Sequence, residues 1–416
     1  ILTQPDILSH AKTANKVMPR LVALHDKEPF AHYAAGLLAL RTYDATTAQK
    51  QARRMLQLAP GSMNATMLLA AAQIQEGKLP AADHTVAPLL AGKNGAQLRL
   101  GYVRILIEYG RYSHARQRLR ELLKSNPHDN DALLLLAQTD LSLNRLDEAK
   151  HVLQSIPSDD KKRDSQVQLY LGHIAENRRD YAAALEHYKQ AAQGGLRLSA
   201  GLRQARVLAE TGHPRQARVV LAVLLSVYPQ RRSDIIVVQS QILIDNGDTA
   251  DALSIINQAL GNAPHDDNLL YQRALLYDQM KRTPSAEKAL RKLLDANPYD
   301  ARYLNALGFV LAEHNPPQKL GEARQLIGRA LAMAPEDPAV LDSMGWVLFR
   351  QGETGPALKH LQQAYTLAPD PQIAAHLVQV LAVSGKPQTA RQTLDKALQL
   401  NPNSAALQAA EKYVKQ

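Results

Sequence analysis

Two pairs of adjacent carboxylates, Asp159–Asp160 and Asp266–Asp267, are the residues whose type and spacing could support general acid and base chemistry. Both pairs lie in polar stretches between apolar, periodic segments. Aspartate at such a place commonly caps the first turn of a helix by accepting a backbone hydrogen bond. We therefore interpret both pairs as helix caps or solvated loops, and not as catalytic acids.

Motifs that bind phosphates, dinucleotides or catalytic zinc are absent, and so is the nucleophile elbow of hydrolases. None of the 14 histidines has another histidine three or four residues away, so the sequence offers no helical metal site. The chain has no cysteine, which excludes disulfides, thiolate metal sites and a cysteine nucleophile. We expect no catalytic residue, cofactor or metal, and we interpret the chain as non-enzymatic.

The segment 301–402 contains three consecutive copies of one pattern. Two copies place an apolar residue before a glycine, and the third departs with Leu377-Val378. Each copy carries two alanines further on and closes at Pro335, Pro369 or Pro402, at intervals of 34 and 33 residues. This period and pattern are typical of the tetratricopeptide repeat (TPR), a pair of antiparallel helices that stacks on its neighbours. The fold class that we predict is all-α: a TPR solenoid, a right-handed superhelix of antiparallel helix pairs.

Small residues in the pattern have a packing role. We expect Gly308 and Gly345 to let the two helices of a pair approach closely. Larger side chains in place of Ala323 or Ala357 would overpack the contact with the next helix, at a cost of ~1–3 kcal/mol each. A short helix pair cannot bury its apolar face alone, so the copies must share one continuous core.

The same pattern in weaker form divides most of the chain. We predict a partial repeat or N-terminal helix over 1–28, kinked or restarted at Pro19, then a TPR array of about eleven repeats over 29–402, and a capping helix over 403–416. Residues 156–165 are expected to form a polar connector, and about three extra residues enlarge the inter-helix turn at 314–319.

Charge is unevenly distributed along the chain. Residues 1–232 hold 32 Lys and Arg against 20 Asp and Glu, whereas residues 233–416 hold 17 against 19. The first part could attract an anionic partner, or could simply be a solvated basic exterior. Binding of nucleic acid would require interleaved aromatic residues, and few are present, so we expect none. No run of 18 apolar residues occurs that could span a membrane.

The repeat phase also predicts which side chains face inward from the first helix of each pair, where such solenoids usually bind partners. Aromatic residues beside arginine are favoured at the centres of protein interfaces. The alternative is that these rings only pack between helices. The candidate partner-binding residues are Arg302, Asn305, Phe309, Asp342, Trp346 and Phe349.

The segments Asp342–Trp346 (DSMGW) and Asp370–Leu377 (DPQIAAHL) resemble a family of proteobacterial outer-membrane TPR lipoproteins. The resemblance implies a periplasmic adaptor, similar to NlpI, that binds a carboxyl-terminal processing protease and helps deliver proteins such as cell-wall hydrolases for degradation. It also implies contact with the membrane only through a lipid anchor upstream of Ile1. Other TPR lipoproteins scaffold the synthesis and export of exopolysaccharide, and this role is the alternative.

Overall fold

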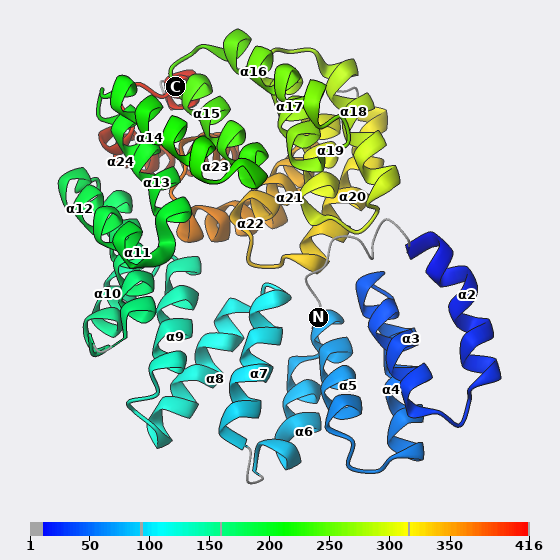
Figure 1. Cartoon of the computed structure of the whole chain (residues 1–416). Helices are drawn as coiled ribbons and strands as arrows, with labels where there is room; N and C mark the ends of the chain where they lie inside the picture. Colours follow the sequence, from blue (N-terminus) through cyan, green and yellow to red (C-terminus); the bar gives the residue numbers. More distant parts are fainter. Residues whose placement is uncertain (1–10, 92–94, 159, 315–316, 415–416) are drawn as a thin grey trace. The chain divides into compact units, whose positions relative to one another are not determined.

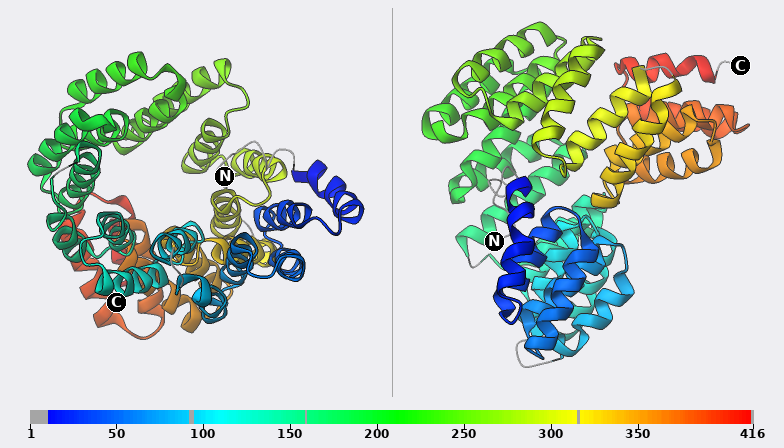
Figure 2. Two further views of the ribbon diagram at one scale, coloured as in Figure 1. Left: turned by 60° about the horizontal axis from the view of Figure 1, so that its bottom comes forward. Right: turned by 90° about the vertical axis from the view of Figure 1, so that its right-hand side faces the viewer.

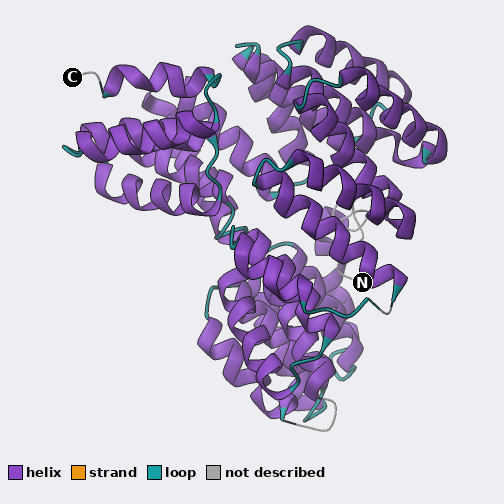
Figure 3. Cartoon of the chain, turned by 90° about the vertical axis from the view of Figure 1, so that its left-hand side faces the viewer, coloured by secondary structure: helices purple, strands orange, loops and turns teal. Residues whose placement is uncertain are grey.

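The computed structural model describes residues 11–91, 95–158, 160–314 and 317–414. These residues form helices, short helical turns and loops, with no strand among them (Figure 3). Successive helices pair and stack on the next pair, as the ribbon in Figure 1 shows. The predicted all-α TPR solenoid is confirmed.

The first helices of the chain are α2 (Ala11–Leu24), the pair α3 (Pro29–Arg41) and α4 (Ala45–Leu58), the pair α5 (Met63–Gln75) and α6 (Leu79–Leu90), and the pair α7 (Gly95–Glu108) and α8 (Tyr112–Ser125). The middle pairs are α9 (Asn130–Ser142) and α10 (Leu146–Gln154), α11 (Lys161–Asn177) and α12 (Tyr181–Ala191), α13 (Arg197–Glu210) and α14 (Pro214–Val227), α15 (Arg232–Asp245) and α16 (Thr249–Asn262), and α17 (Asp267–Gln279) and α18 (Thr283–Ala296).

The last pairs are α19 (Ala301–His314) and α20 (Leu320–Met333), α21 (Pro338–Arg350) and α22 (Thr354–Leu367), and α23 (Pro371–Val383) and α24 (Pro387–Leu400). The described residues thus form eleven pairs, as the period predicts. The short helix α25 (Ala405–Ala410) packs on α23 at the red end of the chain in Figure 2 and buries Leu407 and Ala410, as expected of a cap. Four single turns, η1 to η4, span Ala192–Leu196, Pro229–Arg231, Pro317–Lys319 and Glu411–Tyr413.

A residue with positive φ closes the first helix of ten pairs. This left-handed conformation ends a helix and reverses the chain within a few residues. Four of the ten are not glycine, although glycine adopts the conformation at the lowest cost. The ten residues are Tyr43, Gly77, Gly110, Asn144, Arg179, Gly212, Gly247, Lys281, Gly352 and Gly385.

The helices of a pair approach closely at the predicted glycines. A Cβ on Gly308 would lie 2.5 Å from Cγ1 of Ile327, and one on Gly345 would lie 2.6 Å from Cγ of Leu361. The alanines recur at the same spacing in each repeat. They place fully buried methyl groups at the contacts between helices, at Ala323, Ala330, Ala357 and Ala364. The packing role predicted for these small residues is confirmed.

Aspartates cap the helices where the sequence predicts them. The side chain of Asp266 accepts a hydrogen bond from the backbone N–H of Leu269 at 3.0 Å, and Asp160 accepts one from Arg163 at 2.7 Å. The polar connector is shorter than predicted, because the cap at Asp160 starts α11 at Lys161.

The N-terminal helix also differs in part from the prediction. Residues 1–10 of the predicted segment 1–28 lie outside the described residues. Of the two outcomes predicted at Pro19, a new helix is wrong, since α2 runs through this proline, and a kink stays a prediction. None of the described helices is both long and apolar enough to cross a bilayer.

The chain divides into two compact units, 1–118 with 294–416 and 119–293. In the first unit, the backbone N–H of Ser113 donates to Oε2 of Glu336 at 2.9 Å, and the rings of Tyr43 and Tyr299 stack with centroids 6.4 Å apart. Two parts of the sequence that are far apart therefore share this unit.

A glycine pair tests the close approach of the helices. Gly345→Ala should lower the free energy of unfolding by ~1–3 kcal/mol, because the new methyl group meets Leu361. Gly355→Ala, in α22, meets nothing within 4 Å and should be neutral or stabilising by ~0.5–1 kcal/mol. Thermal unfolding of both variants measures the difference. Equal effects would show that Gly345 is not a packing constraint.

Candidate functional site

Four aromatic side chains from the first helices of three successive pairs lie together. We call them the aromatic cluster: Phe309 on α19, Trp346 and Phe349 on α21, and His376 on α23. The rings of Trp346 and His376 stack with centroids 4.2 Å apart. Phe349 lies 5.6 Å from Trp346, and Phe309 lies 6.1 Å from His376, both in tilted arrangements.

The repeat itself brings these rings together. In α19 and α21 the aromatic residue directly follows the glycine that faces the second helix of its own pair. One residue turns the direction of the side chain by roughly 100° along a helix, so Phe309 and Trp346 leave that contact. The first helices pack against one another, α19 on α21 and α21 on α23. Equivalent positions of neighbouring repeats therefore become neighbours in space.

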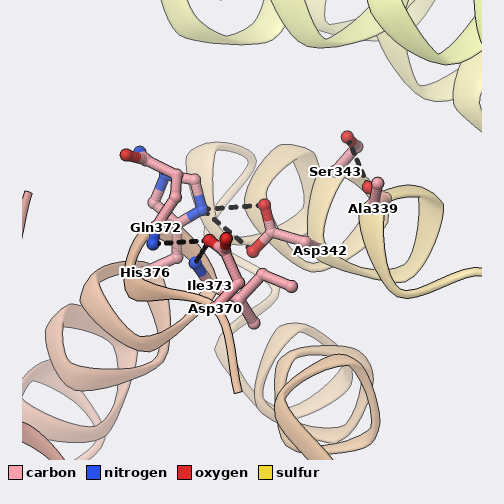
Figure 4. A network of polar contacts seen from close by, with 7 residues as sticks. All are labelled: Ala339, Asp342, Ser343, Asp370, Gln372, Ile373 and His376. Carbon is pink, nitrogen blue, oxygen red and sulfur yellow. Dashed lines mark hydrogen bonds and ion pairs between the residues drawn. The ribbon is translucent and has the colours of Figure 1, made fainter. Parts of the chain in front are cut away.

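A buried ion pair holds the centre of the cluster (Figure 4). Nδ1 of His376 lies 2.9 and 3.0 Å from the two carboxylate oxygens of Asp342, and both side chains are buried. Burial alone lowers the pKa of His376, but the adjacent Asp342 carboxylate raises it by charge and hydrogen bonding, and Glu313 and Asp370 add to this effect. The net shift of the pKa is upward, which favours the imidazolium form.

Gln372 accommodates both protonation states of His376. Its Nε2 lies 3.1 Å from Nε2 of the ring, so the amide donates to a neutral imidazole whose Nδ1–H donates to Asp342. When the ring is protonated, the Gln372 amide can rotate by half a turn, and its oxygen then accepts a hydrogen bond from the Nε2–H of His376. The ring thus stays in one orientation, under Trp346, in either state.

Polar atoms of this face lack partners in the protein. Trp346 is only 7% exposed, and its Nε1–H, a donor, has no acceptor. Oδ1 of Asn305 and Oε2 of Glu313, both acceptors, have no donor. A buried polar atom without a partner costs ~1–3 kcal/mol. The three atoms are buried, so they lower the stability of the fold, and a ligand docked on this face does not reach them.

The C-terminal end of α19 is held by a side chain of the next repeat, Arg350 on α21. Nη1 of Arg350 donates to the carbonyl oxygens of Ala312 and Glu313, at 2.6 and 3.0 Å. These carbonyls belong to the last turn of α19, which has no internal partners for them. Arg350 therefore holds α19 and α21 in one register beside the cluster.

The structure brings together four of the six predicted residues. Three of them make ring contacts in the cluster, and the fourth makes a hydrogen bond with His376. Phe309, Trp346 and Phe349 belong to the cluster, and Asp342 binds His376. Asn305 lies on the same helix as Phe309, four residues earlier, so it shares that helix face. The sixth residue, Arg302, is held instead by Asp300, at 2.7 Å, and lies over the ring of Tyr303.

Sequence reasoning missed His376 and Gln372. The signal was present, because His376 follows Asp342 by 34 residues, which is one repeat period. Trp346 is buried, which agrees with the alternative interpretation that the rings only pack between helices. Phe309 and Phe349 are half-buried, so part of each ring is accessible to a partner. Binding by these residues stays a prediction.

The other chemical candidates have structural roles. Asp160 and Asp266 cap helices, and Asp159 lies outside the described residues. Within the described ranges, no group of three or more His, Asp and Glu side chains is arranged to hold a metal ion. Asp83 accepts from Tyr102 at 2.8 Å and contacts His114 at 3.0 Å, which joins α6, α7 and α8.

Family models of the tetratricopeptide repeat match residues 106–173, 243–308 and 343–405. Together with the stacked helix pairs, these matches show that the chain contains tetratricopeptide repeats and folds as a solenoid of them. Proteins with these repeats act as scaffolds that bind other proteins, and no enzyme family is indicated. We therefore describe the cluster as a candidate protein-binding face.

Two curated relatives match about half of the chain each. The TPR repeat-containing protein PA4667 of Pseudomonas aeruginosa is 38% identical over 207 residues, which are 50% of this chain and 35% of that protein. The cellulose synthase 2 operon protein C of Komagataeibacter xylinus is 28% identical over 204 residues, 45% of this chain and 16% of that protein. The chain thus matches about a third or less of the length of these relatives.

Among solved structures, yeast Tom70 is similar over 97% of this chain and 92% of its own, with 15% identity and a TM-score of 0.47. The TPR protein TTC0263 of Thermus thermophilus is 20% identical and has a TM-score of 0.40, over 44% of this chain and all of its own.

The ion pair in the cluster predicts a dependence of stability on pH. Because the folded pKa of His376 lies above its unfolded value of about 6.5, its stabilisation is present below that pH and is lost as pH rises through the folded pKa. The melting temperature of the wild type should fall over this range, and that of Asp342→Asn should fall less. His265→Gln, which changes an exposed histidine in the turn between α16 and α17, should keep the wild-type profile. Identical profiles for wild type and Asp342→Asn would contradict the assignment.

Proposed function

We propose that this chain is an adaptor that binds an extended segment of a partner protein on the aromatic cluster. The observation that carries the proposal is the group of aromatic rings that three successive repeats place together around Trp346, which stacks on His376. Half-buried Phe309 and Phe349 beside it offer apolar contact area, which aromatic residues provide at little cost in side-chain entropy.

For the partner we propose a carboxyl-terminal processing protease, with cell-wall hydrolases among the substrates. Support comes from the resemblance to LbcA, the adaptor lipoprotein of the protease CtpA, and from the match of half the chain to a TPR protein of Pseudomonas aeruginosa. The proposed location is the periplasm, through a lipid anchor on the outer membrane. An adaptor of this kind works by raising the local concentration of substrate near the protease.

This proposal predicts that the purified chain has no proteolytic activity and accelerates hydrolysis by a purified carboxyl-terminal processing protease. Phe349→Ala removes one half-buried ring of the cluster. It should raise the adaptor concentration for half-maximal acceleration roughly tenfold, the effect of losing a binding contact of about 1.4 kcal/mol.

Phe30→Ala is the matched control, because it too removes a phenylalanine ring, here an exposed one on α3 and outside the cluster. This variant should accelerate the protease as the wild type does. Failure of the wild-type chain to accelerate the protease would sink the adaptor proposal. Equal effects of the two variants would leave the adaptor but remove the cluster from its binding site.

A second candidate is a scaffold in exopolysaccharide synthesis or export. It is favoured by the match to a cellulose synthase operon protein and by the excess of Lys and Arg in residues 1–232. Retention of an anionic polysaccharide at low salt that is abolished at high salt would support it, because screening weakens such binding. Acceleration of the protease without any retention of polysaccharide would favour the adaptor.

A further inference from the structure

Helix α14, the second helix of its pair, presents valines to solvent. Val219, Val223 and Val227 are 63%, 48% and 45% exposed. They recur every four residues, so they form one stripe about 12 Å long on the face opposite the buried Ala217, Leu221 and Leu224. We call these three residues the valine stripe.

The stripe is unusual for this fold. Valine forms helices less readily than alanine, because its branched side chain loses rotamer freedom, and exposure gives it no compensating burial. Among the second helices of the eleven described pairs, α14 is the only one with more than one large apolar side chain exposed, and the single other case is Leu400 on α24. The terminal helix α2, which has no preceding pair to pack on among the described residues, also exposes Val17, Leu21 and Leu24. The valines do not stabilise α14, so helix stability does not explain why they are exposed. Contact with a partner would explain it.

Arginines bracket the stripe. Arg215 and Arg218 are exposed before it, and Arg231 and Arg232 are exposed after it. Arg231 pairs with Asp234 at 2.5 Å, but the other three have no carboxylate partner among the described residues.

We propose that the valine stripe is a docking site for an amphipathic helix of a partner protein whose apolar face is flanked by Asp and Glu. Apolar residues at helical spacing on the partner would cover the valines, and its carboxylates would pair with Arg215, Arg218 and Arg232. The stiff, branched valines suit one defined packing arrangement.

Other occupants fit less well. A second copy packed antiparallel through α14 would place Arg215 and Arg218 of one chain near Arg231 and Arg232 of the other, and like charges repel. Helices that lie on membranes carry Trp, Phe or Leu on the apolar face, and the stripe has only valine. The inference is independent of the aromatic cluster, which lies in the other compact unit.

A photo-crosslinking amino acid at position 223, in the full chain in envelope extract, identifies the occupant by mass spectrometry of the crosslinked peptide. The proposal expects a segment with apolar residues at helical spacing between acidic residues. A crosslink to this same chain, to lipid, or to a segment without that pattern overturns it, and so does the absence of any crosslink.

Binding of the captured segment, as a synthetic peptide, to the full chain then tests the contacts. The variant V219A/V223A/V227A should weaken the affinity at least tenfold, while its melting temperature stays equal or rises, because alanine is the better helix former. A drop in melting temperature with unchanged affinity would assign the stripe a structural role instead. Val383→Ala, which changes an exposed valine on α23, should leave the affinity unchanged, with a melting temperature that likewise stays equal or rises.

Charge exchange tests the role of the arginines. R215E/R218E should weaken binding of the same peptide at least tenfold, and a peptide with Lys in place of its Glu should recover most of that loss. If the peptide with Lys binds no better to R215E/R218E than to the wild type, the arginines do not contact the partner and the proposal fails.

Discussion

The close approach of two helices within each pair is the constraint on which the structure depends. Gly308 and Gly345 face Ile327 and Leu361 at distances that leave no room for a Cβ, and buried alanines complete the contact. A pair packed this tightly is still too small to bury its apolar surface alone, so it must stack on its neighbours. The core then grows along the array, with one set of contacts repeated.

The same constraint produces the candidate binding face. Because the glycine turns toward the second helix, the aromatic residue after it turns away, and neighbouring repeats place such residues side by side. The pair Asp342–His376 crosses from one repeat to the next and fixes the ring beneath Trp346. Breaking one partner of a buried ion pair leaves the other charge uncompensated, so this contact constrains α21 and α23 together.

A protein that brings other proteins together needs more than one surface. The aromatic cluster offers a few partly buried rings from three successive repeats, which suits an extended segment of a partner. The valine stripe offers an exposed apolar line between arginines, which suits a helix. The two surfaces have different chemistry and lie in different compact units, so two different partners can be bound by one chain.

The sequence alone determined the helix pairs, their period and their caps, because these depend on local residues: small residues at the contact, aspartate at Asp266, a left-handed turn residue such as Gly352. It also placed Phe309 and Trp346 on one face. Only the tertiary structure decided that His376 joins them, that Asp300 holds Arg302, and that α2 continues through Pro19. These outcomes depend on contacts between helices and on competing hydrogen-bond partners, which no spacing within a single repeat specifies.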